Sequence, residues 1–133
     1  MKIALVQYNP ASEDKGINKK KILSLVQDIN GVELFIFPEM TLTGFTMKSD
    51  EMSETIQGDS FRFFASIAKE KSANILAGII ERRKNCTYNT LIHIKPDGNL
   101  CKLYRKVHPF SYSGENENFN AGSKPAYTKI KSW

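Results

Sequence analysis

The sequence has few of the residues that build covalent or metal-linked scaffolds. Only two cysteines, Cys86 and Cys101, and two histidines occur among its 133 residues. Two isolated cysteines do not form a disulfide-rich pattern, and no close Cys/His cluster has the spacing of a zinc site. We therefore expect reduced thiols, a cytoplasmic protein and no bound metal.

Long hydrophobic runs and dense blocks of one charge are also missing. No apolar stretch approaches the ~20 residues of a membrane-spanning helix, so no membrane partner is expected. The net charge is +5, but the basic residues are spread along the chain and alternate with acidic ones. Proteins that bind nucleic acid carry denser basic segments or aromatic residues placed among them, so nucleic-acid binding is the least favoured hypothesis.

The first third of the chain has the pattern of a strand, a helix and a second strand. Residues 2–7 and 34–37 read as strands, and apolar residues recur at helical spacing over residues 12–30, with Gly31 as the stop. A strand, helix and strand in this order predict a parallel pair joined by a crossover helix, which indicates an α/β layer.

The rest of the chain alternates between one helix, three strands and loops. We expect a loop with a short helical turn over 48–57, a helix from Asp59 or Ser60 to about 71, strands over 74–81, 87–94 and 100–105, a long irregular segment over 107–123, and a further strand over 127–133. Asp97-Gly98 between two strand-like runs is a strong hairpin signal.

Glu39 follows the apolar run 34–37 directly after Pro38. A carboxylate held at the end of a buried strand, beside apolar surface, suits a general base that acts near neutral pH. A strand-end glutamate that is simply solvated is an equally good reading of these residues alone.

Four motifs in order resemble the nitrilase superfamily of carbon–nitrogen hydrolases, over essentially the whole chain. They are the strand Ile3-Ala4-Leu5-Val6-Gln7, the block Phe37-Pro38-Glu39 with Thr43-Gly44-Phe45, the segment Tyr88-Asn89-Thr90 ahead of Pro96-Asp97-Gly98, and the block Tyr104-Arg105-Lys106-Val107-His108. Without the resemblance, Asn89 reads as an ordinary polar residue at a strand edge, and Lys106 as part of a solvated Arg-Lys pair.

The resemblance implies the N-terminal half of an αββα four-layer sandwich and a catalytic Glu, Lys and Cys, with no cofactor. By this resemblance Glu39 is the general base, and Lys106 stabilises the oxyanion of a tetrahedral intermediate. A second glutamate orients the lysine in many members, and Glu115 is preferred over Glu117 for that place. The substrate is a small amide or nitrile whose non-peptide C–N bond is cleaved through a thioester.

The nucleophilic cysteine of the family is not found at its place in chain order. Cys86 and Cys101 both precede the Lys106 block and read as inert residues. Residues 1–133 are therefore expected to form a single partial domain, truncated before the nucleophile strand and inactive alone. Such a chain would associate with another copy or with the missing C-terminal half. The alternative is a non-catalytic interaction module with the same half-fold.

Overall fold

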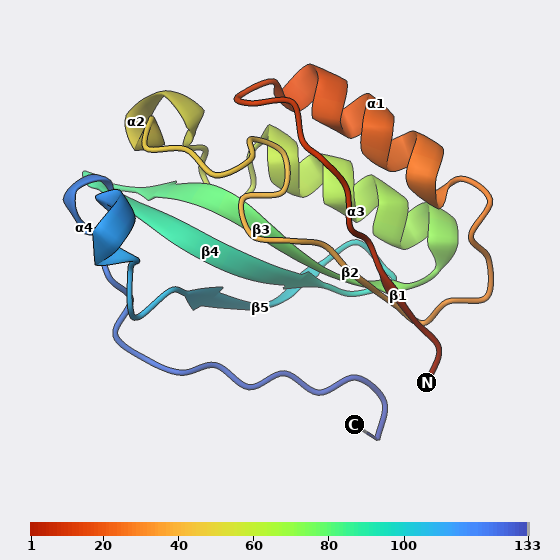
Figure 1. Ribbon diagram of the computed structural model, residues 1–133. Helices are drawn as coiled ribbons and strands as arrows, with labels where there is room; N and C mark the ends of the chain where they lie inside the picture. Colours follow the sequence, from red (N-terminus) through yellow and green to blue (C-terminus); the bar gives the residue numbers. More distant parts are fainter. Residues whose placement is uncertain (133) are drawn as a thin grey trace.

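A computed structural model describes residues 1–132, and Trp133 lies outside the described residues. One five-stranded sheet, in the order β1-β2-β3-β4-β5, carries the helices α1 and α3 on one face (Figure 1). The elements are β1 (Ile3–Leu5), α1 (Lys15–Val26), β2 (Leu34–Ile36), α2 (Ser49–Met52), α3 (Asp59–Lys71), β3 (Asn74–Arg83), β4 (Cys86–Ile94), β5 (Leu100–Arg105), the 3-10 helix η1 (Ser111–Ser113) and α4 (Glu115–Asn118).

The sheet is parallel in its first half and antiparallel in its second. β1, β2 and β3 pair in parallel through crossover helices, which confirms the α/β layer predicted from the strand–helix–strand pattern. β3, β4 and β5 follow as antiparallel hairpins. At the β4–β5 turn Gly98 has a φ of +80°, and the N–H of Lys95 donates to the carbonyl of Asn99 at 2.9 Å. The predicted Asp-Gly hairpin is confirmed.

The predicted extent of the first helix is wrong at both ends. α1 begins after Asp14, whose carboxylate accepts the N–H of Ile17 at 2.8 Å, and it ends at Val26 rather than near residue 30. The polar residues Asp28 and Asn30 favour turns over a helix interior, so the chain leaves the helix before Gly31. Figure 1 shows the loop that then returns to β2.

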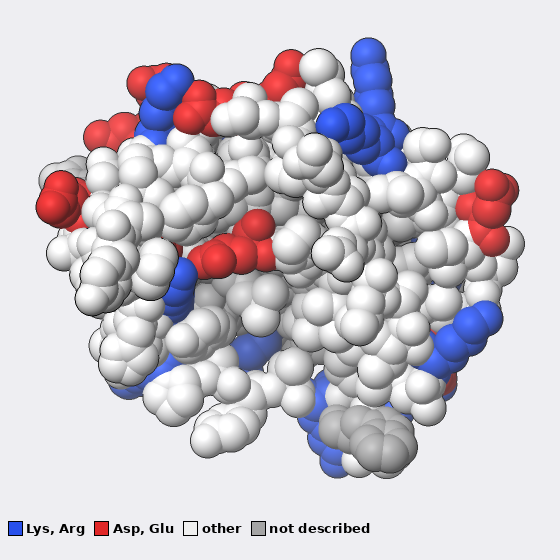
Figure 2. Space-filling view, viewed as in Figure 1, with Lys and Arg blue, Asp and Glu red and all other residues white. Residues whose placement is uncertain are grey.

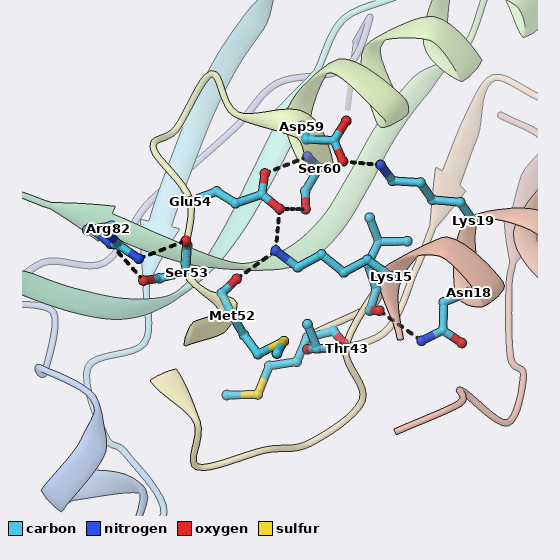
Figure 3. A network of polar contacts seen from close by, with 12 residues as sticks. Lys15, Asn18, Lys19, Thr43, Met52, Ser53, Glu54, Asp59, Ser60 and Arg82 are labelled. Carbon is cyan, nitrogen blue, oxygen red and sulfur yellow. Dashed lines mark hydrogen bonds and ion pairs between the residues drawn. The ribbon is translucent and has the colours of Figure 1, made fainter. Parts of the chain in front are cut away.

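Helix α3 begins at Asp59, as predicted, but a distant side chain caps it. Glu54 accepts the backbone N–H of Ser60 at 2.7 Å and its hydroxyl at 2.8 Å. The same carboxylate is bonded to Lys15 of α1, so one partly buried acid joins both helices to the loop between α2 and α3 (Figure 3). On the other side of this loop, Arg82 of β3 donates to the hydroxyl of Ser53 at 3.0 Å.

The main hydrophobic core lies between the sheet and its two helices. Phe37 packs on Phe64 of α3 with ring centroids 5.1 Å apart, and Ile22 of α1 is fully buried in the same cluster. Alternate residues of β3 and β4, among them Ile75 and Ile92, point into this core. The remaining residues of each strand face the opposite side of the sheet, called the open face below.

The chain after β5 differs from two expectations. The segment 107–123 is not wholly irregular, because it contains η1 and α4. The expected strand at 127–133 is not formed over residues 127–132. Instead this segment runs along the open face (Figure 1), where Thr128 bonds to the ring of His93 at 2.5 Å. It covers only part of that face, and Leu5 remains 76% exposed.

Candidate active site

The loop that carries Glu39 is fixed against β3 by backbone contacts. The N–H of Gly78 donates to the carbonyl of Pro38 at 3.2 Å, and the N–H of Thr41 donates to the carbonyl of Gly78 at 2.9 Å. A Cβ on Gly78 would lie 2.6 Å from the nitrogen of Met40 and 2.7 Å from the Cα of Glu39. Only glycine therefore allows this close approach of the loop to the strand.

A strained backbone follows Glu39 directly. Met40 has a φ of +44° and is almost fully buried. A non-glycine residue in this region is held there by its surroundings, and such positions gather at functional sites. Asn18 of α1 supports the loop from below by donating to the carbonyl of Leu42 at 2.8 Å. Tyr8 donates to the carbonyl of Thr41, and burial raises the pKa of Tyr8 to about 12, so it stays a donor.

Lys106 directly follows β5 and lies opposite Asn89 of β4. The N–H of Lys106 donates to the carbonyl of Asn89 at 2.9 Å, which continues the pairing of β4 with β5 by one residue. The alternation of β4 places the Asn89 side chain on the open face together with Leu91. Glu115 opens α4 and accepts the backbone N–H of Phe110 at 2.6 Å.

These residues converge around one ammonium group. Lys106 Nζ lies 2.8 Å from Glu39 Oε1 and 2.8 Å from Glu115 Oε2. Asn89 Nδ2 lies 2.8 Å from Glu115 Oε1 and also donates to Glu39 Oε1. The Glu115 side chain is fully buried, whereas that of Glu39 is 47% exposed. Glu115 is thus the interior partner of Lys106, and Glu39 is the acid that solvent or a ligand can reach.

The hydrogen bonds of this cluster favour the charged forms of its buried members. Burial lowers the pKa of Lys106, but the hydrogen bonds to Glu115 and Glu39 outweigh it and hold the pKa above its usual value. Burial raises the pKa of Glu115, but the donors Asn89, Lys106 and the N–H of Phe110 outweigh it and lower the pKa. An ionised lysine and an ionised Glu115 are therefore expected at neutral pH.

A hollow of about 180 Å³ opens at the cluster. Its walls are Glu39, Gly78, Asn89, Leu91, Tyr104 and Lys106. Figure 2 shows acidic side chains in a hollow of one face, over the loop that follows β2, with mostly uncharged surface around them. In residues 1–132 no group of three or more His, Cys, Asp and Glu side chains gathers as metal ligands would. No helix in the same range is long and apolar enough to cross a membrane.

All three predicted site residues meet here. Lys106 contacts both Glu39 and Glu115, whereas the competing Glu117 is exposed. Sequence reasoning gave Asn89 no role at the site, but the structure buries it between the two carboxylates. The alternation of β4 was the available signal, since it assigns Asn89 to one face of the strand.

Neither cysteine of the chain can reach this cluster. Cys86 lies three residues before Asn89 on β4, so its side chain points to the opposite face of the sheet. Cys101 lies five residues before Lys106 along β5, which is roughly 17 Å in an extended strand. Its sulfur is 3.9 Å from the hydroxyl of Thr128, next to His93 rather than Glu39.

Comparison with known proteins gives one consistent result. The sequence model of the carbon-nitrogen hydrolase family matches residues 2–130. A nitrilase of Pyrococcus abyssi is 30% identical over 117 residues, which are 83% of this chain and 44% of that protein. The 2-oxoglutaramate amidase of Bacillus subtilis is 27% identical over 127 residues, which are 94% of this chain and 48% of that protein.

A solved structure agrees with these relatives. A CN-hydrolase superfamily protein of Xanthomonas campestris, with an arsenic adduct in its active site, superposes with a TM-score of 0.93 at 26% identity. The superposition covers 98% of this chain and 49% of that one. The chain thus spans about half the length of the curated relatives and the solved structure that it matches.

Proposed function

Because the chain belongs to the carbon-nitrogen hydrolase family, we propose that its site serves the hydrolysis of a C–N bond in a small amide. Glu39 is the general base and Lys106 the oxyanion-stabilising cation, while Glu115 holds Lys106 in place. The nucleophile is a cysteine from outside residues 1–133, since Cys86 and Cys101 lie away from the cluster. A nitrile is the second substrate class that the family relatives suggest.

The first half of the reaction forms a thioester. Glu39 takes the proton of the thiol as the sulfur attacks the amide carbon, because the thiolate is the reactive form. The carbonyl oxygen becomes an oxyanion beside the Lys106 ammonium, and one such donor lowers the barrier by about 3–4 kcal/mol. The C–N bond then breaks, and Glu39 returns its proton to the departing nitrogen, which leaves as ammonia or an amine.

The second half hydrolyses the thioester. Glu39 removes a proton from water as the water oxygen attacks the acyl carbon. Lys106 again faces the oxyanion, the C–S bond breaks, and Glu39 passes the proton taken from water to the departing sulfur. The products are a carboxylic acid and the free thiol, so each residue ends in its starting state.

One observation carries this proposal: Lys106 Nζ stands 2.8 Å from both Glu39 and Glu115 at the wall of the hollow. A lysine clamped by a buried carboxylate keeps its charge and its place, which is what oxyanion stabilisation needs. A solvated surface lysine would have neither constraint. The partly exposed Glu39 has the access that a base requires.

A chimera tests the proposal. In the 2-oxoglutaramate amidase of Bacillus subtilis, the segment that aligns with this chain is replaced by this chain, and ammonia release from a panel of small amides is measured. We expect hydrolysis that falls at least about 100-fold on Glu39→Gln or Lys106→Met. Lys124→Met, at an exposed position outside the cluster, is the matched control and should leave the rate unchanged.

Two outcomes would contradict the proposal. A chimera that is folded by circular dichroism but releases no ammonia from any amide would do so, and so would release that survives both substitutions. The 133-residue chain alone is expected to release none and to gain no acyl mass in intact-mass spectrometry. An acyl adduct on Cys86 or Cys101 would show that this cysteine, and not one outside residues 1–133, is the nucleophile.

A non-catalytic interaction module is the second candidate. The exposed apolar side chains of the open face, among them Leu5 at 76% and Ile3 at 45%, favour it. It differs from the first candidate in requiring association but no hydrolysis.

A further inference from the structure

Asn89 is held rigidly between two carboxylates. It lies on β4, pairs with Ile80 of β3, and accepts the N–H of Lys106 at its carbonyl. Its side chain is buried, and only 6% of the residue is exposed. Polar side chains in such positions are retained only where their hydrogen bonds are made.

The two hydrogens of the Asn89 amide are both used. An asparagine Nδ2 carries two hydrogens, and here one donates to Glu39 Oε1 and the other to Glu115 Oε1 at 2.8 Å. The flipped amide would turn Oδ1 toward two carboxylates, where it would be repelled. The charges around Asn89 therefore fix its orientation.

The hydrogen bonds of the two glutamates show which of their carboxylate oxygens are already occupied by donors. Glu115 Oε1 accepts from Asn89, and Glu115 Oε2 accepts from Lys106 and the N–H of Phe110. Glu39 Oε1 accepts from both Asn89 and Lys106. Within residues 1–132, Glu39 Oε2 is the one carboxylate oxygen of this cluster with no donor. Lys106 uses two of its three hydrogens on the carboxylates, so one is left for a ligand.

We propose that Asn89 is a positioning residue for the reaction. By donating one hydrogen to each carboxylate, Asn89 keeps Glu39 Oε1 hydrogen-bonded within the cluster. Glu39 Oε2 is then the atom that accepts the proton of the nucleophile. Asn89 also keeps Glu115 locked on Lys106, so the third Lys106 hydrogen points to the oxyanion. This inference rests on the proposed function, but its first test needs no catalysis.

That test is nuclear magnetic resonance on the labelled 133-residue chain. During an acid titration, the side-chain amide protons of Asn89 should shift as the Glu115 carboxylate, to which Asn89 donates, is protonated. In Asn89→Ala, the titration midpoint of the Glu115 carboxyl carbon should move to higher pH, because the carboxylate loses a hydrogen bond that lowers its pKa. Asn74→Ala is the matched control, since Asn74 is a half-buried strand asparagine bonded to His93, away from the cluster.

The inference is overturned if the Asn89 amide protons do not respond to acid, or if folded Asn89→Ala leaves the Glu115 midpoint unchanged. Asn89→Ser, which has one hydroxyl in place of two amide hydrogens, replaces the alanine variant if that one does not fold. If neither variant folds, the amide-proton titration of the unchanged chain still tests whether Asn89 donates to the carboxylates.

A second test uses the chimera. Asn89→Ala should lower kcat/KM by about 100-fold, as a small misplacement of reacting groups does, with most of the loss in kcat. The acid limb of its pH–rate profile should move to higher pH, because Glu115 loses a hydrogen bond that lowers its pKa. A residue that only packed the strand would change neither. An inactive wild-type chimera refutes the proposed function and leaves the titration result standing.

Discussion

Lys106 is the residue on which the electrostatics of the cluster depend. It faces the fully buried Glu115 on one side and the half-exposed Glu39 on the other. Removing one partner of a buried ion pair costs several kcal/mol, because the remaining charge is left without a counter-ion. The side chain of Lys106 is itself 27% exposed, so the loss should be smaller than for a wholly buried pair.

We therefore expect Lys106→Met to lower the free energy of unfolding by about 2–3 kcal/mol. The measurement is urea denaturation at neutral pH, followed by circular dichroism. Lys102→Met is the matched control, because Lys102 lies on β5, which Lys106 directly follows, and has an exposed side chain. An equal effect of both substitutions would show that Glu115 does not depend on Lys106.

The pKa of Glu115 predicts how stability changes with acid. A carboxyl group whose pKa is lower in the folded than in the unfolded chain stabilises the fold above its unfolded value, and this stability is lost as the pH falls through its folded value. The pKa of Glu115 is lowered from 4.5, with its donors outweighing burial. The free energy of unfolding should therefore fall when the pH is lowered from neutral to below 4.5.

The matched variant is Glu115→Gln, which cannot titrate. Urea unfolding across the same pH range should show a shallower fall for this variant than for the unchanged chain. Parallel curves for the two proteins would mean that Glu115 is not the titrating group.

At the scale of elements, the approach of the Glu39 loop to β3 depends on Gly78. The Cβ of an alanine there would meet backbone atoms of Met40 and Glu39 at 2.6 and 2.7 Å, so the loop must move. The backbone atoms of the loop cannot move aside individually, as the end of a flexible side chain can. The displacement would carry the Glu39 carboxylate away from Lys106 and Asn89.

Gly78→Ala should cost about 1–3 kcal/mol of unfolding free energy, as overpacking usually does. Gly16→Ala in α1 is the control, since its Cβ would lie 3.4 Å from Asp14 Oδ1 and alanine favours a helix by about 0.5–1 kcal/mol. Urea denaturation measures both. A neutral Gly78→Ala would contradict the proposed role of this glycine.

At the scale of the whole molecule, the open face of the sheet leaves apolar side chains exposed. Ile3, Leu5 and Leu91 are 45%, 76% and 38% exposed there, although they belong to regular strands. Burying one large aliphatic side chain contributes about 1.5–3 kcal/mol. A few such contributions are comparable to a typical total stability of about 5–15 kcal/mol.

We expect the 133-residue chain to self-associate through this face at micromolar concentration. Sedimentation velocity should show mass rising with concentration, and Leu5→Lys should weaken this rise. Leu23→Lys on the outer surface of α1, at a residue that is 44% exposed, is the control and should not. A well-folded monomer at the same concentration would count against both the association and the interaction-module alternative.

Much of the architecture followed from local sequence. The apolar run 34–37 predicted β2, and Asp97-Gly98 predicted the hairpin of β4 and β5, because these features depend on residues close in the chain. The end of α1 and the helical turns after β5 were not predicted. The apolar spacing of α1 does not by itself give its buried face: Ile17 and Leu25 are exposed, whereas Asn18 is buried and bonds to the Glu39 loop.

By itself the sequence determined the succession of strands and helices along the chain, the resemblance to a hydrolase family, and the candidates Glu39, Lys106 and Glu115. Only the tertiary structure decided that Glu115 rather than Glu117 meets Lys106, and that Asn89 and Gly78 shape the site. The reason is separation: the Lys106–Glu39 contact joins residues 67 positions apart, and the Asn89–Glu39 contact joins residues 50 apart. These contacts form only when the loops after β2 and β5 pack on the same sheet, so they cannot be predicted from patterns of neighbouring residues.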